Sequence, residues 1–441
     1  MRENYRPISL LSNLSKIFER AMHTRLYSFI EEFDSFYDLQ YGFRKKYSTD
    51  HALLSIVEEI RQNLDNGLFS CGVFVDLEKA FDTVNHKNLL AKLEHYGVRS
   101  VANDWFRSYL SNRSQLVDLG NDASSSKNVT CGVPQGSILG PLLFLLYIND
   151  MRHALKFSVV HHFADDTNLL YSHKNQKILR KNINTDLELL FQWLCANRLS
   201  LNVKKTEFII FRPARTSLKD RVTLTLNGCK IFESTKVKYL GIILDPRLTW
   251  KHHIFELSKK LSRSVGMLYN MKKLGCDDKI LLSLYYSLFQ SHLGYGLAAW
   301  GSSVFAKNLF VIQKRAIRAL FGLSYNDSTS DSFRKFKILS LENLYRLKLA
   351  SLMWDFDHSL LPSHLQKLFK YSSEIHSYGT RSSENANLAR NFSCNTQVGS
   401  LMLKFMGPKV LNSLKNLSFY HLCHTKHSFI SKYKTYLLDN P

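Results

Sequence analysis

The sequence has no CxxC pair, no long apolar run and a shortage of acidic side chains relative to basic ones. Its seven cysteines are scattered, which argues against a disulfide framework and fits free thiols in a reducing compartment. The most apolar stretches, such as Ile138 to Ile148 and Ile280 to Phe289, are too short to span a membrane. The start of the chain, MRENYRPISL, is polar and does not resemble a signal peptide. We therefore expect an intracellular protein with no membrane segment.

The charge of the chain points to a polyanionic partner. There are 59 Lys and Arg residues against 37 Asp and Glu residues, a formal net charge of +22. An excess of this size favours nucleic acid or an anionic membrane, and nucleic acid is the better fit where no membrane segment exists. The 441 residues, 45% of them hydrophobic, are enough for two to four subdomains of a folded protein.

The order of apolar patterns predicts an α+β fold. Helical spacing predicts helices over residues 14–29, 52–64 and 178–197, and apolar runs predict strands over 71–77 and 237–245. The stretch 199–211 predicts a strand pair or one strand with a turn, and the polar residues 121–127 predict a loop between strands. From Lys251 onward the pattern is helical, so a catalytic core with strands is expected to precede a helical domain.

Two adjacent aspartates interrupt an otherwise apolar pair of strands. In VVHHFADDTNLLYS, Asp165 and Asp166 occupy the expected turn. Repulsion between neighbouring carboxylates is relieved by a cation, and oxygen ligands suit hard divalent ions such as Mg²⁺. Asp76 ends the strand CGVFVD and is the candidate third carboxylate. Taken singly, Asp165 and Asp166 fit a solvated turn and Asp76 fits a helix cap. Only their combination with the loop VPQG favours a metal site.

A two-metal carboxylate site predicts phosphoryl transfer. One ion lowers the pKa of an attacking hydroxyl while the other stabilises the leaving oxygen. With nucleic acid as the partner, nucleotidyl transfer to a 3′-hydroxyl is the favoured reaction. Nuclease activity is the competing reaction class, because the same ions serve it.

An ordered set of motifs resembles the reverse transcriptases of non-LTR retrotransposons, which are LINE-like elements of the jockey and CR1 type. The motifs are NYRPISLLSNLSKIFER from Asn4, QYGFRKKYSTDHAL from Gln40, VFVDLEKAFDTVNH from Val73, GVPQGSILGPLLFLLYIND from Gly132, FADD from Phe163, LSLNVKKTEFIIF from Leu199 and KYLGIILD from Lys238. Phe163 stands where the family usually has tyrosine. Further segments resemble the family's thumb and C-terminal part: YGLAAWG from Tyr295, IQKRAIRALFG from Ile312, IHSYGTRS from Ile375 and GPKVLNSL from Gly407. In the last of these, Leu411 replaces the usual tryptophan.

The resemblance implies a right-hand polymerase fold with fingers, a palm containing an antiparallel sheet, a helical thumb and a mostly helical C-terminal segment. The expected divisions are fingers at 1–70, palm with part of the fingers at 71–250, thumb at 251–326 and C-terminal segment at 327–441. The motif NYRPISLLSNLSKIFER, which resembles the family's first fingers motif, begins almost at the first residue. We therefore expect a chain truncated at its N-terminus that lacks the endonuclease of full-length elements.

The resemblance also implies roles for individual residues. Asp76, Asp165, Asp166 and the Leu77 carbonyl are expected to hold two Mg²⁺ ions, with Mn²⁺ as the alternative ion, and Asp165 is the expected indispensable ligand. Arg44, beside Lys45 and Lys46, is expected to bind the triphosphate, and Phe81 is expected to act as a steric gate. Gln135 and Gly136, beside Ser137, are expected to contact the nucleotide. Lys205 is the expected proton donor, with Lys204 as the alternative. Lys259, Lys260 and Arg263, on the polar face of a predicted helix, are expected to follow a nucleic-acid backbone.

Each of these residues has a simpler interpretation as well: a core phenylalanine, a helix start, a surface lysine pair or a solvated helix face. The implied function is RNA-directed DNA polymerase, extending a DNA primer with dNTPs on an element RNA, made in the cytoplasm and acting in the nucleus for integration. The alternative is a catalytically inactive truncated remnant that retains only nucleic-acid binding. Phe81 and the thumb motifs disfavour an RNA-dependent RNA polymerase.

Overall fold

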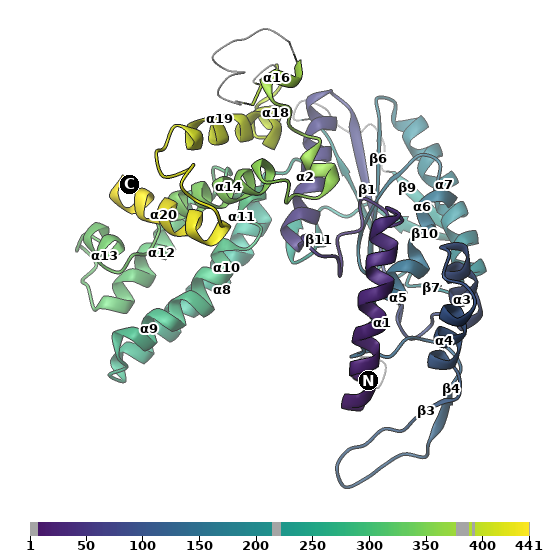
Figure 1. The fold of residues 1–441 in the computed structure, drawn as a ribbon. Coiled ribbons are helices and arrows are strands. Elements are labelled where there is room, and N and C mark those ends of the chain that lie inside the picture. The colour runs from purple at the N-terminus through teal and green to yellow at the C-terminus, as the bar shows by residue number, and fades with distance from the viewer. Residues whose placement is uncertain (1–7, 214–221, 376–387, 390–392, 441) are drawn as a thin grey trace. The chain divides into compact units, whose positions relative to one another are not determined.

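The computed structural model describes residues 8–213, 222–375, 388–389 and 393–440, and its contacts divide the chain into two compact units (Figure 1). Unit 1 comprises Met1–Ser48, Cys71–Phe208 and Leu218–Ser234, and unit 2 comprises Thr49–Ser70, Ile209–Ser217 and Thr235–Pro441. The beginning of the first motif and most of IHSYGTRS lie outside the described residues. The expected division into fingers, palm, thumb and C-terminal segment stays a prediction.

Strand pairing places the predicted hairpin at one side of a four-stranded sheet. The strand order is β5-β6-β1-β8, from β1 (Phe69–Val75), β5 (Val159–Phe163), β6 (Asp166–His173) and β8 (Glu207–Phe211). β5 and β6 are antiparallel with Phe163 opposite Asp166, which leaves Ala164 and Asp165 as the turn. The predicted strands at 71–77 and 159–172 are therefore confirmed within about two residues. The stretch 199–211 forms two strands, β7 and β8, but they do not pair with each other: β7 (Ser200–Leu201) pairs with β2 (Leu77–Glu78), and β8 belongs to the four-stranded sheet.

Helices and short hairpins complete unit 1. Its helices are α1 (Asn13–Glu32), α3 (His86–His95), α4 (Val101–Leu110), α5 (Leu139–Ile148), α6 (Met151–Ala154) and α7 (Gln176–Ala196). Its short strands pair as β2 (Leu77–Glu78) with β7 (Ser200–Leu201), β3 (Arg113–Gln115) with β4 (Lys127–Val129), and β9 (Thr223–Leu226) with β10 (Cys229–Phe232). The predicted loop at 121–127 joins β3 to β4, which extend as a ribbon away from the other strands (Figure 1).

The apolar helix α5 forms the centre of unit 1. Nine of its ten residues are buried, and it packs against α1 and α3. α7 packs against β6 and β9 and so covers the sheet. The predicted helix at 14–29 is present as α1, but Leu14, Ile17 and Phe18 are exposed while Glu19 is buried. Glu19 is buried because its carboxylate accepts hydrogen bonds from the Ile138 backbone N–H (2.7 Å) and the Tyr109 hydroxyl (3.0 Å).

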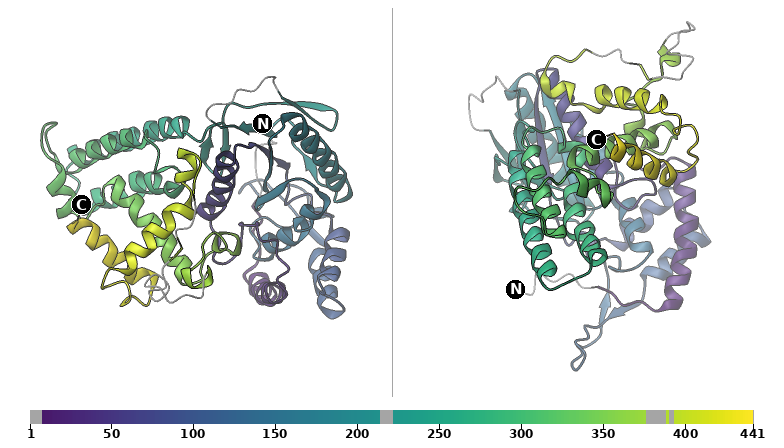
Figure 2. Two further views of the ribbon diagram at one scale, coloured as in Figure 1. Left: turned by 90° about the horizontal axis from the view of Figure 1, so that it is seen from above. Right: turned by 90° about the vertical axis from the view of Figure 1, so that its left-hand side faces the viewer.

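Unit 2 is mainly helical. Its helices are α2 (Thr49–Asp65), α8 (Lys251–Lys273), α9 (Asp278–Leu284), the π-helix Tyr285–Gln290, α10 (Ser291–Gly294), α11 (Leu297–Trp300), α12 (Ala306–Phe321), α13 (Ser330–Lys335), α14 (Leu341–Asp357), α15 (Ser363–Gln366), α16 (Ser372–Ile375), α18 (Gln397–Ser400), α19 (Leu403–Lys415) and α20 (Lys426–Asp439). α8 packs against α12, and α14 packs against α19 and α20; Figure 2 shows these teal-green to yellow helices from two further sides. The helical pattern expected after residue 250 is thus confirmed.

The sequence VKYLGIILD departs from the single strand predicted for it. It forms two antiparallel strands, β11 (Val237–Tyr239) and β12 (Ile242–Leu244), joined by Leu240 and Gly241. Both joining residues have positive φ, 44° and 81°, which is the requirement of a tight hairpin turn. The leucine at the first of these positions concealed the turn from a sequence-based prediction.

The strands, the helices and their order confirm the predicted α+β class. Within the described residues, none of the helices combines the length and the apolar character needed to cross a lipid bilayer.

A buried carboxylate fixes the start of β5. Asp186 of α7 accepts hydrogen bonds from the backbone N–H groups of Lys156 (2.9 Å), Phe157 (3.0 Å) and Ser158 (2.9 Å), and its side chain is fully buried. Three backbone donors that precede the hairpin therefore depend on one side chain of a covering helix.

We expect Asp186→Ala to lower the free energy of unfolding by about 3 kcal/mol or more, because each buried N–H group left unpaired costs about 1–3 kcal/mol. Urea denaturation followed by circular dichroism measures the change. Asp104→Ala is the matched control: Asp104 is exposed and pairs weakly with Arg107 at 3.7 Å, so its loss should change the free energy by less than about 0.5 kcal/mol. Equal effects of the two substitutions would contradict the role assigned to Asp186.

Candidate active site

The turn between β5 and β6 carries Asp165. Ala164, the first turn residue, has a φ of 55°, a region that costs energy for a residue with a Cβ atom. Asp165 follows it, and its carboxylate lines a cavity of about 1120 Å³. Asp166 is already the first residue of β6 and does not line this cavity. Of the two adjacent aspartates expected to project into one volume, only Asp165 therefore lines the cavity.

Asp76 reaches the same cavity from the end of β1. Its backbone is fixed by the turn that follows β7: the Asp76 carbonyl accepts the Asn202 N–H at 2.9 Å, and the Asp76 N–H donates to the Thr206 hydroxyl oxygen at 3.5 Å. The pairing of Leu77 with Leu201 continues this connection. Residues of the motif LSLNVKKTEF therefore hold the backbone in place at the end of β1, where Asp76 lies.

Lys205 lies at the same side of the cavity. Its ammonium nitrogen is 4.0 Å from the Asp76 carboxylate, and its side chain is 73% exposed. The turn also provides a hydrogen bond from the Lys205 N–H to the Asn202 side-chain oxygen at 3.3 Å. An ion pair this long and this exposed contributes little stability, so Lys205 is available for a ligand in the cavity.

Phe81 is held by stacking on a core residue. Its ring centroid is 4.4 Å from that of Phe144 in α5, with 27° between the planes. The Phe81 carbonyl accepts the Val133 N–H at 2.8 Å. Both contacts fix the ring at the edge of the cavity, because one sets the side chain and the other sets the backbone.

The loop before α5 is attached to the segment around Phe81. The Gln135 side-chain N–H donates to the Asp82 carboxylate at 2.9 Å. Gly132 has a φ of 89°, and a Cβ atom there would lie 2.6 Å from the Asp82 carbonyl oxygen, so only glycine allows this approach. Gly136, with a φ of 102°, leaves the loop close to Ser9, whose N–H donates to the Gln135 carbonyl at 2.8 Å.

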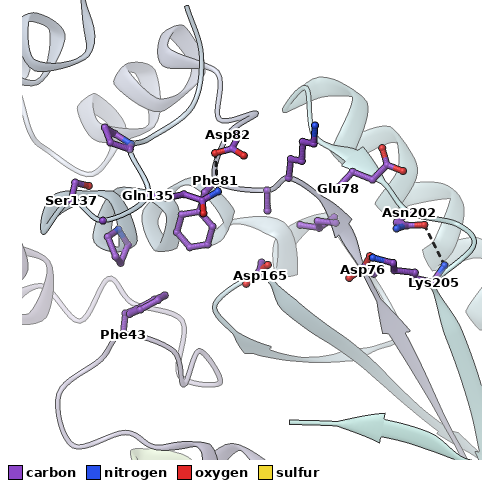
Figure 3. A pocket seen from close by; sticks show the side chains of 16 residues that line it. Phe43, Asp76, Glu78, Phe81, Asp82, Gln135, Ser137, Asp165, Asn202 and Lys205 are labelled. Atoms are coloured by element: carbon purple, nitrogen blue, oxygen red, sulfur yellow. Dashed lines mark hydrogen bonds and ion pairs between the residues drawn. The ribbon is translucent and has the colours of Figure 1, made fainter. Parts of the chain in front are cut away.

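The cavity brings together seven residues to which the sequence assigned a role, and Ser137, named beside two of them, also lines it (Figure 3). The seven are Asp76, Leu77, Phe81, Gln135, Gly136, Asp165 and Lys205. All belong to unit 1. Their expected roles stay predictions, but the residues that the motifs placed far apart in the sequence do line a single space.

Five predicted residues do not line this cavity. Asp166 starts β6, and Lys259, Lys260 and Arg263 are exposed on α8 of unit 2. Arg44 is engaged locally: its guanidinium donates to the Tyr37 carbonyl at 2.9 Å and lies 4.1 Å from the Tyr47 ring centroid. Its expected contact with a triphosphate stays a prediction.

Sequence reasoning missed several residues of the cavity. Phe43, Glu78, Lys79, Asp82 and Asn202 also line it. Phe43 is 56% exposed, has a φ of 52° and meets the Phe81 ring edge-on, with centroids 6.4 Å apart. The sequence did carry a signal for Phe43: it stands between a glycine and Arg44 in a polar, basic turn. An aromatic residue in such a turn has no apolar neighbours in sequence with which to form a core.

The donor set fits a divalent ion in part. Within the described residues, no group of three or more His, Cys, Asp or Glu side chains is arranged to hold a metal ion. Asp76 and Asp165 nevertheless supply two oxygen donors to one solvent-open cavity. Mg²⁺ is commonly bound through one or two carboxylates together with water and substrate phosphates, and this pair meets that requirement.

A family model described as "Reverse transcriptase (RNA-dependent DNA polymerase)" matches residues 2–244. The match extends over the motifs from NYRPISL to KYLGIIL and confirms the resemblance drawn from them. It also supports the predicted right-hand polymerase fold. Members of this family generally use divalent metal ions.

Curated relatives resemble the chain over most of its length. It is 31% identical over 346 residues to a probable RNA-directed DNA polymerase from transposon BS of Drosophila melanogaster, which covers 73% of this chain and 37% of the relative. It is 28% identical over 352 residues to the RNA-directed DNA polymerase from mobile element jockey of the same species, covering 77% of this chain and 38% of the relative. The chain therefore spans less than two fifths of the length of these relatives. Among solved structures, apo telomerase from Candida tropicalis is similar with a TM-score of 0.41 and 15% identity, over 72% of this chain and 53% of that chain.

A buried histidine lies on the strand that leads to the turn. Burial, with a smaller contribution from neighbouring His161, lowers the pKa of His162 from 6.5 to about 3. The ring is hydrogen-bonded to the Thr167 hydroxyl at 3.0 Å, across the hairpin. His162 is therefore neutral in the folded protein at all pH values near neutrality.

This burial predicts acid sensitivity. The unfolded chain binds a proton at His162 below pH 6.5 while the folded chain does not, so stability is complete above pH 6.5 and falls as the pH drops towards 3. Between pH 7.5 and 5 the wild type should lose about 2 kcal/mol more than His162→Asn. Urea denaturation at the two pH values measures this difference. Identical losses in both proteins would show that His162 does not titrate on unfolding.

Proposed function

This chain belongs to the reverse transcriptase (RNA-dependent DNA polymerase) family, and on that premise we propose that it acts as an RNA-directed DNA polymerase of a non-LTR retrotransposon. The observation that carries the proposal is the shared cavity: Asp76 at the end of β1 and Asp165 at the hairpin turn line it together with Phe81 and Gln135. The substrates are dNTPs, a DNA primer and the element RNA as template. We further propose synthesis in the cytoplasm and action in the nucleus for the integration step.

The reaction is transfer of a nucleotide to the primer. The primer 3′-hydroxyl loses its proton to solvent as its oxygen forms a bond to the α-phosphorus of a dNTP. The bond from that phosphorus to the oxygen bridging the α- and β-phosphates breaks, and pyrophosphate leaves. We assign proton donation to the leaving pyrophosphate to Lys205, because its ammonium group is at the cavity and only weakly paired. Lys204 does not line the cavity and is the weaker candidate.

The proposed ions are two Mg²⁺, with Mn²⁺ as the alternative. Asp76, Asp165 and the Leu77 carbonyl would hold them; Asp166 is proposed on its motif alone, since it does not line the cavity. Such ions, when bound, lower the pKa of the attacking hydroxyl and stabilise the leaving oxygen. The chain itself contributes two carboxylates to one cavity, Asp76 from the end of β1 and Asp165 from the turn between β5 and β6.

The polar face of α8 supports the proposed contact with nucleic acid. Lys259, Lys260 and Arg263 are exposed, while Leu257, Leu261 and Leu268 of the same helix are buried. Lys259 forms an ion pair with Glu256 at 3.0 Å, an exposed pair that a phosphate can replace at little cost. These cations would bind a backbone without reading its sequence.

The polymerase proposal predicts primer extension. Purified protein with poly-rA/oligo-dT, Mg²⁺ and dTTP should lengthen the primer, and Asp165→Ala should reduce incorporation to background because it removes one of the two cavity-lining carboxylates proposed to hold the ions. Asp104→Ala, an exposed aspartate outside the cavity, is the matched control and should extend at the wild-type rate. A folded wild-type preparation that binds RNA–DNA hybrid and incorporates nothing contradicts the proposal and favours the inactive remnant.

The fixed ring of Phe81 predicts sugar selectivity. Stacking on Phe144 prevents the ring from moving aside, so a ribose 2′-hydroxyl should be excluded. Phe81→Ala should raise the ratio of rUTP to dTTP incorporation by about 10- to 100-fold, the range expected for a change of pocket shape. Phe255→Ala, an exposed phenylalanine of α8, should leave the ratio unchanged even if it alters overall binding. If Phe81→Ala leaves the ratio of rUTP to dTTP incorporation unchanged, Phe81 is not a steric gate against ribose.

A further inference from the structure

We propose that Gln40 is a positioning residue for Asp165, acting through a brace formed by Leu39–Gly42 against the turn of the β5–β6 hairpin. The proposal rests on the proposed function, because it takes Asp165 as a ligand of the divalent ions. Gln40 does not line the cavity and touches none of the reacting groups. Its influence on the reaction therefore has to pass through the backbone of the turn.

The brace follows β5 as a short parallel partner. Gln40 forms a parallel bridge with His162. The Tyr41 N–H donates to the His162 carbonyl at 2.8 Å, and the His162 N–H donates to the Leu39 carbonyl at 2.9 Å. Leu39 and the start of the motif QYGFRKKYSTDHAL are thus hydrogen-bonded to the strand that ends two residues before Asp165.

The Gln40 side chain extends this connection into the turn itself. It is 2% exposed, and its side-chain oxygen accepts two backbone N–H groups, that of Gly42 at 2.8 Å and that of Ala164 at 3.1 Å. Ala164 is the turn residue with positive φ, next to Asp165. A strained backbone conformation persists only where neighbouring contacts hold it in place. The hydrogen bond from the Ala164 N–H to the Gln40 side-chain oxygen is one contact that holds Ala164 at its positive φ.

Gly42 allows the brace to come close enough. A Cβ atom at Gly42 would lie 2.3 Å from the Ala164 nitrogen, a contact that backbone atoms cannot relieve without moving. The absence of a side chain at residue 42 and the acceptor at residue 40 therefore act on the same peptide group. Together they set the direction in which the Asp165 carboxylate leaves the turn.

A purely structural role for Gln40 would lower stability without changing metal affinity, so metal affinity is the informative measurement. Removing a group that orients a metal ligand typically weakens metal binding about 10- to 100-fold. We expect Gln40→Met, which keeps the length but loses the acceptor, to raise the Mn²⁺ dissociation constant of the full chain by about that factor, measured by electron paramagnetic resonance titration. Gln40→Glu, which keeps an acceptor oxygen, should restore affinity to near the wild-type value.

Gln313 provides the matched control. It is fully buried in α12 of unit 2, its side-chain oxygen accepts the Leu341 N–H at 2.8 Å, and its side-chain N–H donates to the Leu339 carbonyl at 2.9 Å. Gln313→Met should therefore lower stability as Gln40→Met does, yet leave Mn²⁺ affinity unchanged. Equal Mn²⁺ affinity of wild type, Gln40→Met and Gln313→Met would overturn the brace.

Two further comparisons separate the possible failures. If Asp165→Ala binds Mn²⁺ as well as the wild type does, the metal site of the proposed function fails, and the brace fails with it. If Asp165→Ala loses binding while Gln40→Met does not, only the brace is wrong. Should Gln40→Met fail to fold, Gln40→Asn, which withdraws the acceptor by one methylene group, is expected to weaken Mn²⁺ binding in the same direction; wild-type affinity in that variant would refute the proposal.

Discussion

The antiparallel pairing of β5 with β6, with Phe163 opposite Asp166, determines where the acidic residues can be. It makes Ala164 and Asp165 the whole turn, so one carboxylate leaves at the tip and the next belongs to a strand. The remaining parts of the site are arranged around that tip: β1 brings Asp76 beside it, and Leu39–Gly42 lies against its back. A shift of the register by one residue would exchange the two aspartates and separate Asp165 from the cavity.

The cavity is assembled mainly by backbone hydrogen bonds between motifs rather than by contacts among its polar side chains. Asn202 bonds to the Asp76 carbonyl, Val133 to the Phe81 carbonyl, and Ser9 to the Gln135 carbonyl. Backbone links leave the side chains free to face a ligand while the strand ends and loops stay in place. This explains why the motifs contain glycines and small residues beside the functional ones: close approach of one main chain to another requires them.

Much of this arrangement could be predicted from local sequence. The hairpin of ADD between apolar runs, the strand ending at Asp76 and the buried helix after VPQG follow from periodicity and turn residues, and the structure has them. The hairpin in VKYLGIILD could not be predicted, because leucine rarely adopts the positive φ found at Leu240. The burial of Glu19 depends on an N–H group more than a hundred residues away, and the inclusion of Phe43 in the cavity depends on tertiary placement. Such long-range partners leave no periodic trace in a single sequence.

The stacking of Phe81 on Phe144 makes the position of a ring that lines the cavity depend on a residue of the hydrophobic core. Phe144 is fully buried in α5, where a substitution would ordinarily be judged only by the cavity it leaves. Here a smaller side chain at residue 144 would also give the Phe81 ring room to tilt. In the proposed function, that ring is the group that excludes a ribose 2′-hydroxyl. Under the role proposed for Phe81, discrimination between ribose and deoxyribose would therefore deteriorate through a substitution at a buried residue that touches no substrate.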